Sequence, residues 1–166
     1  MRRYWLMKTE PNCFSLDDLE QSPGGVAPWD GVRNFQARNF LRDEIQPGDG
    51  VLFYHSSCAE PAVVGLAAVV RGGYPDHTAL DPQAKHFDPK ASPENPIWYM
   101  VDVQFRLRLP HPLTRGDLRR RPLLQEMMVL QRGSRLSVQP VTAGEWRAVL
   151  ELAGVAYLLA EGEANG

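Results

Sequence analysis

Two almost continuous apolar runs, 51–55 and 62–70, constrain the fold of this chain more than any other feature of its sequence. Neither run alternates cleanly between apolar and polar residues, as a strand with one face in water would. They therefore predict strands that are covered on both faces or closed into a barrel. A third candidate strand, 97–107, alternates from Val101 onward, and an aromatic-rich strand is predicted at residues 3–8.

Three helices are predicted from their capping residues. Ser15 is followed three residues later by Asp18, and Thr142 is followed by Glu145, so each pair can form a capping box at a helix start. Asn34 is expected to begin another helix, because its side chain can accept a hydrogen bond from the first turn.

The last of these helices, after Thr142, carries Trp146 and Val149 on one face, which should pack against the strands. Residues 72–95 contain four prolines among charged residues and predict a long irregular loop. The triplet 110–112, Pro-His-Pro, should break the third strand.

Several strands with short helices inserted between them favour the α+β class, with a small bent barrel, over a doubly wound sheet. The chain has 166 residues, which suits one domain with a real hydrophobic core. We therefore expect a single domain over residues 1–156, followed by a C-terminal tail over 157–166.

Composition and charge limit the function. The net charge is −2 and the pI is about 6.1, which argues against bulk electrostatic capture of nucleic acid but leaves room for a pocket that recognises one base. No apolar run approaches about 18 residues, so no membrane association is expected. Since no signal-peptide core is present, we expect a cytoplasmic protein, whose two cysteines should stay reduced. A GC-rich bacterial genome would explain the many arginines as well as any function would.

The segment 29–40 holds the most informative polar and aromatic groups. Trp29 offers a flat face for stacking, Gly31 gives backbone access, and Asn34 can both donate and accept hydrogen bonds. Such groups suit a slot for a flat heteroaromatic ring. The alternatives are that Trp29 plugs one end of the barrel and that Asn34 only caps its helix.

Two kinds of chemistry compete with binding. Nucleophilic catalysis would use His55 as the base for Ser56, Ser57 or Cys58, but neighbouring strand side chains face opposite ways, and no nucleophile elbow surrounds them. A metal would have to draw on residues scattered in the 72–95 loop, where no ligand spacing is recognisable. These candidate loop residues are Asp76, His77, Asp81, His86 and Asp88.

The block 29–40 (WDGVRNFQARNF), taken with 4–11 and 48–56, resembles the EVE domain family, a branch of the PUA-like superfamily. Further matching blocks follow in order through most of the chain, at 14–19, 65–69, 74–78, 98–103, 133–141 and 145–146. The resemblance implies a PUA-like bent β-barrel with short helices covering its openings. The related YTH domains grip a methylated adenine in an aromatic cage, and EVE domains are similar in fold and hold modified cytosine or related bases by stacking and flipping.

Carried onto this sequence, the resemblance implies a base pocket and a rim that contacts the nucleic-acid backbone. The pocket would be lined by Lys8, Thr9, Trp29, Gly31, Asn34, Tyr54, His55, Ser56 and Tyr74. The rim would be formed by Arg33, Arg38, Trp98, Arg135 and Ser137.

We therefore expect a binding module, not an enzyme, that recognises a modified nucleobase in DNA or RNA through an aromatic-lined pocket. It should act as a monomer without cofactor or metal, with a nuclease or a modifying enzyme as a further partner. One rival hypothesis is a small hydrolase or nucleotide-processing enzyme. The other is a sensor of a free small aromatic metabolite, which the mild acidity would suit.

Overall fold

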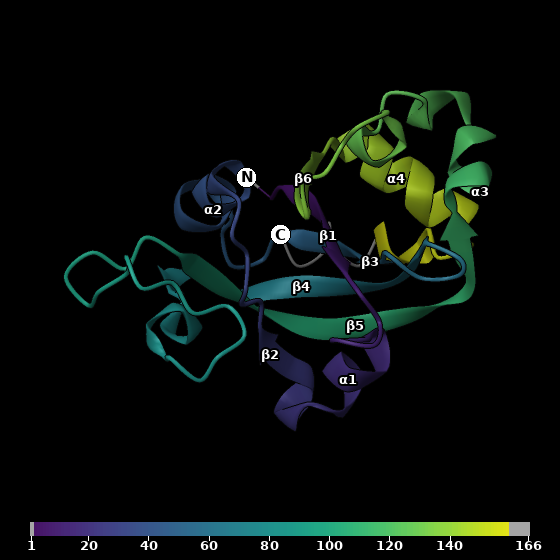
Figure 1. Cartoon of the computed structure of the whole chain (residues 1–166). Helices are drawn as coiled ribbons and strands as arrows, with labels where there is room; N and C mark the ends of the chain where they lie inside the picture. The colour runs from purple at the N-terminus through teal and green to yellow at the C-terminus, as the bar shows by residue number, and fades with distance from the viewer. Residues whose placement is uncertain (1, 160–166) are drawn as a thin grey trace.

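The computed structural model describes residues 2–159, which form one six-stranded mixed sheet with short helices on both of its faces (Figure 1). The strands are β1 (Tyr4–Thr9), β2 (Val26–Pro28), β3 (Gly50–His55), β4 (Ala62–Pro75), β5 (Tyr99–Thr114) and β6 (Val138–Val141). The α-helices are α1 (Leu16–Gln21), α2 (Phe35–Asn39), α3 (Arg115–Arg119) and α4 (Ala143–Leu152). Shorter turns are η1 (Pro23–Gly25), the π-helical η2 (Phe40–Glu44), η3 (His77–Leu80), η4 (Pro122–Leu124) and η5 (Met128–Leu130).

The strand order in the sheet is β2-β5-β4-β3-β1-β6. β1 and β3 are parallel, with Tyr4 opposite Gly50, and every other pair is antiparallel. Because parallel neighbours need a crossover connection, the chain between them is long. That crossover carries α1, β2 and α2 and supplies one wall of the site described below.

The predicted α+β class is confirmed, but the strands are not hydrogen-bonded into a closed barrel. β2 pairs only with β5, and β6 pairs only with β1, so both remain edges of the sheet. Both edge strands are short, and β2 ends at Pro28, which has no N–H to donate to a further strand.

Successive side chains of the central strands pack into two different hydrophobic clusters. Trp5 and Phe53 belong to a first cluster, which also contains the buried residues of α1 and α2. Leu6 and Leu52 belong to a second cluster, which contains the buried face of α4. The prediction that the apolar runs are covered on both faces is therefore confirmed, because each face of the sheet has its own helical layer.

The predicted helix starts are confirmed in detail. Ser15 and Thr142 each form a capping box, and Asn34 accepts a hydrogen bond from the Ala37 N–H at 3.0 Å. Trp146 and Val149 are buried on the inner face of α4, as predicted.

The strands depart from the sequence-based expectation in three places. β4 extends through Pro75 into the predicted loop, and β2 was not predicted. β5 continues past the triplet 110–112, which was expected to end it. The ladder with β4 passes from Arg108 to Leu113, so both prolines of the triplet lie in a bulge, where no ladder hydrogen bond is required of them.

The structure describes the expected C-terminal tail, 157–166, only through Leu159. Leu158 and Leu159 pack against the second cluster, and residues 160–166 lie outside the described part of the chain. Within residues 2–159, no helix combines the length and hydropathy needed to cross a bilayer.

Candidate functional site

A cavity of about 920 Å³ opens where segments far apart in the sequence meet on the first-cluster side of the sheet. Backbone hydrogen bonds join three of these segments, from Lys8 N–H to the Ser137 carbonyl (2.8 Å) and from Ser56 N–H to the Thr9 carbonyl (2.9 Å). The lining residues are Lys8, Thr9, Glu10, Cys13, Phe14, Ala27, Pro28, Trp29, Asp30, Gly31, Val32, Arg33, Ser56, Ser57, Lys85, His86, Arg135 and Ser137.

Trp29 forms an aromatic wall of this cavity and also belongs to the core. Its side chain is only 6% exposed, and its ring meets Phe14 and Phe53 edge-on at centroid distances of 6.3 and 5.4 Å. The indole N–H has no acceptor among the described residues, whereas Trp5 and Trp98 donate theirs to carboxylates. Among the described residues no fully buried side-chain donor is left unpaired, so the Trp29 N–H is in contact with solvent and is available to a ligand in the cavity that this residue lines.

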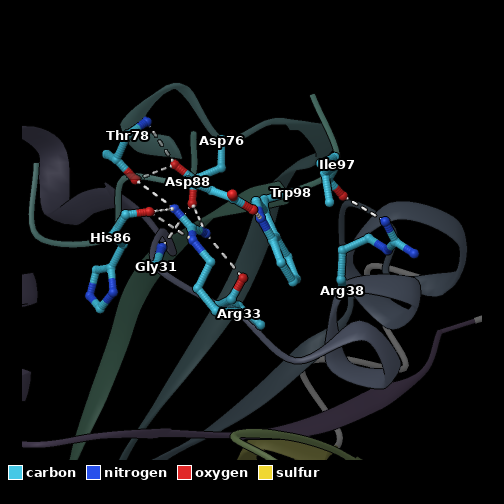
Figure 2. A network of polar contacts seen from close by, with 10 residues as sticks. Gly31, Arg33, Arg38, Asp76, Thr78, His86, Asp88, Ile97 and Trp98 are labelled. Atoms are coloured by element: carbon cyan, nitrogen blue, oxygen red, sulfur yellow. Dashed lines mark hydrogen bonds and ion pairs between the residues drawn. The ribbon is translucent and has the colours of Figure 1, made fainter. Parts of the chain in front are cut away.

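The wall that follows Trp29 is held in place by Asp76, whose carboxylate is completely buried (Figure 2). It accepts hydrogen bonds from the Gly31 N–H (2.8 Å), from Arg33 Nη1 (2.9 Å), and from both the N–H and the hydroxyl of Thr78 (2.9 and 2.6 Å). Burial alone would raise the pKa of Asp76, but these donors lower it below its usual value. Asp76 is therefore a charged anchor for the cavity wall.

Arg33 ties the loop that follows η3 to the same wall. Its Nε and Nη2 donate to the His86 carbonyl at 2.9 and 2.8 Å, while the His86 imidazole lies over Gly31. A Cβ at Gly31 would come within 2.6 Å of that ring, and the residue has a φ of +78°, so only glycine fits this position without strain. Gly31 lines the cavity as predicted, but its N–H is bonded to Asp76 and is not free to contact a ligand.

The cavity is more positive than the chain as a whole. Apart from Arg33, whose charge is paired with Asp76, its lining includes the cations Lys8, Lys85 and Arg135 against the two acids Glu10 and Asp30, in a chain whose net charge is −2. Such a local excess of cations attracts an anionic ligand without making the whole surface basic.

Two of the charged lining groups have shifted pKa values. Burial, helped by the positive charge of Arg115, lowers the pKa of Lys8, whose ammonium group has no hydrogen bond or ion pair among residues 2–159. Burial and the negative charge of Asp76 raise the pKa of Asp30. Perturbed groups that converge on one cavity are typical of binding sites.

Part of the predicted site is brought together by the fold. The predicted pocket residues that line the cavity are Lys8, Thr9, Trp29, Gly31 and Ser56. The predicted rim residues that line it are Arg33, Arg135 and Ser137.

Tyr54 and His55, which were also expected in the pocket, lie outside the cavity. Tyr54 is buried in the second cluster, because strand alternation points it away from Phe53 and toward the α4 side of the sheet. His55 uses Nε2 to accept a hydrogen bond from the Leu16 N–H at 3.1 Å. Burial lowers its pKa, which favours the neutral imidazole that this hydrogen bond requires.

Asn34 and Tyr74 likewise have structural partners away from the cavity. Asn34 caps α2, the alternative that its position at a helix start had suggested. The Tyr74 hydroxyl donates to Asp102, and Arg71 lies 3.5 Å from the centroid of its ring. Burial and the bond to Asp102 raise the pKa of Tyr74 to about 12.

The expected rim residues Trp98 and Arg38 lie beside the cavity wall but do not line it. Trp98 donates its indole N–H to Asp88 at 2.7 Å, and Arg38 donates to the Ile97 carbonyl at 2.6 Å (Figure 2). Both side chains therefore hold the end of the long loop against α2.

The lining residues that were not predicted as part of the pocket include Asp30, Lys85 and His86. Asp30 adjoins Trp29 in sequence and could have been included on that ground, whereas the two loop residues carry no sequence signal beyond their place in a long loop. No group of three His, Cys, Asp or Glu side chains within residues 2–159 is arranged to hold a metal ion.

The sheet and the cavity together define a small α+β binding domain with one aromatic-walled, locally positive site. The chain belongs to the EVE domain family, whose model matches residues 3–152.

Its relatives include thymocyte nuclear protein 1 of Danio rerio, which is 41% identical over 165 residues, covering 89% of this chain and 71% of the relative. A protein from Leishmania major superimposes with a TM-score of 0.87 at 49% identity, over 93% of this chain and 96% of the other. The human THYN1 protein, solved in complex with DNA containing 5-methylcytosine, gives a TM-score of 0.86 at 39% identity, over 91% and 97% of the two chains.

A more distant similarity extends to the YTH domain of the Zygosaccharomyces rouxii MRB1 protein, solved in complex with N6-methyladenosine RNA. The TM-score is 0.53 at 14% identity, with 91% of this chain and 83% of the other covered. At this identity the similarity concerns the fold alone, and it agrees with the relationship to YTH domains that the sequence suggested.

Proposed function

We propose that this protein binds a modified nucleobase of DNA or RNA, turned out of its strand, in the cavity beside Trp29. The observation that carries the proposal is the unpartnered indole N–H of Trp29 in the wall of a cavity with an excess of positive charge. The human relative solved in complex with DNA containing 5-methylcytosine supports the same ligand class.

The lining groups fit distinct parts of a nucleotide. Trp29 supplies an aromatic surface and a donor for a ring carbonyl, and base–aromatic stacking contributes about 1–3 kcal/mol. Asp30 can accept a hydrogen bond from an exocyclic amino group, as acidic side chains do from cytosine N4. The hydroxyls of Ser56 and Ser137 can each donate or accept a hydrogen bond. Lys8 and Arg135 are among the cationic lining residues that could contact a phosphate.

In this proposal the sheet is the partly open form of the PUA-like barrel. Register shifts within the β3–β4 and β4–β5 pairs support this assignment, because bulges bend strands and increase their twist. The cavity would then occupy one opening of the bent sheet, with α1 and α2 beside it.

We also propose that the protein binds without catalysing a reaction. The His55 ring accepts a hydrogen bond from the start of α1, so its Nε2 is not directed at Ser56 as a general base would be. A bound base would be read and retained for a nuclease or a modifying enzyme. Free Cys13 and Cys58 suit a monomer in a reducing compartment such as the cytoplasm.

The test is a titration of the full chain with matched oligonucleotides that differ only at one central base. We expect tighter binding of an oligonucleotide carrying 5-methylcytosine, or another modified base, than of its unmodified counterpart, with the oligonucleotide recovered intact. Equal affinity across the modified and unmodified oligonucleotides would contradict base recognition. Cleavage or conversion of the base would instead favour the enzyme hypothesis.

Asp30→Asn should stabilise the free protein near neutral pH. Because the folded-state pKa of Asp30 is raised, the contribution of its carboxyl group to folding stability is fully present below the unfolded pKa. That contribution is lost as the pH rises through the folded-state pKa and the group ionises. The variant lacks this loss, so it should be more stable at pH 7, by less than about 1 kcal/mol because Asp30 is partly solvated. Urea denaturation between pH 3 and 7 should show the two proteins converging at the acidic end.

The matched control is Glu94→Gln, which removes an exposed carboxylate outside the cavity and should show no such convergence. In binding assays, Asp30→Asn should also reduce the preference between bases with and without an amino group. A variant that is less stable than the parent at pH 7 would show that the Asp30 carboxylate is structural.

A further inference from the structure

An exposed aromatic side chain lies two residues beyond Arg33, next to the cavity wall. Phe35, the first residue of α2, is 59% exposed, whereas most aromatic residues of this chain are buried or partly buried. Its ring stacks on Trp98, with centroids 4.9 Å apart and an interplanar angle of 28°. A single exposed apolar side chain is common on protein surfaces, so its stacking on Trp98 beside the cavity, and not its exposure alone, suggests a role in binding.

Two guanidinium groups extend this stacked pair into a row. Arg33 lies 5.4 Å from the centroid of Trp98, and Arg38 lies 5.0 Å from the centroid of Phe35. We call these four residues the stacking row. Arg33 also lines the cavity, so the row begins at the site and leads away from it over α2.

The row is fixed in position before any ligand arrives. The Trp98 indole is bonded to Asp88, Arg38 is bonded to the Ile97 carbonyl, and Arg33 is bonded to Asp76 and the His86 carbonyl. Figure 2 shows the arginines bonded to the backbone carbonyls of His86 and Ile97, and the indole bonded to the side chain of Asp88. A preorganised surface of this kind loses little side-chain entropy on binding.

We propose that the stacking row is a second nucleic-acid contact, on whose outer end, formed by Arg38 and the exposed part of the Phe35 ring, a nucleotide that flanks the base in the cavity stacks. The proposal rests on the proposed function and extends it from one base to a strand. When one base leaves a stack, its neighbour loses a partner, and an exposed aromatic ring can replace it. Arg38, which has no carboxylate partner among the described residues, supplies charge complementary to the phosphates that join the two nucleotides.

The experiment compares two probes on the full chain, a short single-stranded oligonucleotide with a central 5-methylcytosine and the free nucleoside 5-methyl-2′-deoxycytidine. Phe35→Ala should weaken oligonucleotide binding by about tenfold or more, the loss expected for one base stack. It should leave nucleoside binding unchanged, because the nucleoside occupies only the cavity. Phe35→Trp, which keeps an aromatic face, should retain oligonucleotide affinity.

The matched control is Leu123→Ala, which removes a side chain 60% exposed in η4, on the second-cluster side of the sheet. It should not change either affinity. Unchanged oligonucleotide binding by Phe35→Ala would overturn the stacking row and leave the cavity proposal intact. An equal loss for both probes would also overturn it, since Phe35 would then act by supporting the cavity wall.

A different result would separate the cavity from the row. In this case Phe35→Ala would weaken oligonucleotide binding, but the parent protein would bind modified and unmodified oligonucleotides equally well. Such a result would support the stacking row and contradict base recognition in the cavity. Failure of the parent protein to bind either probe would overturn both proposals. Contact with a protein partner would then be the remaining explanation of the exposed Phe35 ring.

Discussion

Asp76→Ala is expected to lower the free energy of unfolding by about 3–5 kcal/mol, the range for removing one partner of a buried ion pair. The change leaves the partly buried guanidinium of Arg33 without its carboxylate and removes the acceptor of the Gly31 and Thr78 backbone N–H groups. Urea denaturation at pH 7 measures this loss directly. The effect should be among the largest of any polar substitution in the chain, because Asp76 is fully buried.

The pH dependence of this loss distinguishes the charge of Asp76 from its packing. Since the folded-state pKa of Asp76 is lowered, its contribution is present above the unfolded pKa and is lost as the pH falls through the folded-state pKa. The gap between parent and variant should therefore narrow in acid. Asp81→Ala, in the same loop but with an exposed carboxylate, is the control, and an equal loss in that variant would contradict the anchoring role of Asp76.

Trp29→Ala is expected to affect both folding and binding. Since the side chain is 94% buried in the first cluster, its removal should cost about 3–5 kcal/mol of stability, as large-to-small core substitutions do. Where the variant remains folded, it should also lose about 1–3 kcal/mol of affinity for the modified oligonucleotide, the value of one base stack. Thermal melting and titration below the melting temperature measure the two effects separately.

Two further variants isolate the role in binding. Trp29→Phe keeps much of the packing but lacks the indole N–H, so it should fold and yet bind the modified oligonucleotide more weakly. Trp146→Phe removes an equally buried indole from the second cluster and should change stability without changing affinity. If Trp146→Phe weakens binding as much as Trp29→Phe does, the cavity does not hold the base.

The elements that the sequence predicted correctly are those defined by neighbouring residues. The capping boxes at Ser15 and Thr142, and the buried face of α4 with Trp146, need only local spacing. β2 was missed because it is three residues long and is recognisable only through its pairing with β5, as between Ala27 and Val103. The continuation of β5 past its prolines depends in the same way on a bulge that only the partner strand reveals.

The site was predicted in part for the same reason. Alternation along β3 requires that Phe53 and Tyr54 face opposite ways, but both faces of the sheet are apolar, so the sequence could not tell which one the cavity adjoins. The wall that contains His86 is held by Arg33, 53 residues away in the chain. Nothing in the sequence of either segment indicates the contact between Arg33 and the His86 carbonyl. The Arg33 side chain is positioned for it by its ion pair with the buried carboxylate of Asp76.

The residues that line the cavity come from separate segments between Lys8 and Ser137, so nearly the whole domain must fold before the site exists. A ligand that binds there is therefore linked to the global folding equilibrium and not to one loop. At a concentration one hundred times its Kd, such a ligand adds about 2.7 kcal/mol to stability. For a domain of this size, that raises the melting temperature by roughly 5–10 °C. Unlabelled nucleosides and oligonucleotides can thus be ranked by calorimetry of the intact protein, and no excised fragment of the chain would serve as a minimal reader.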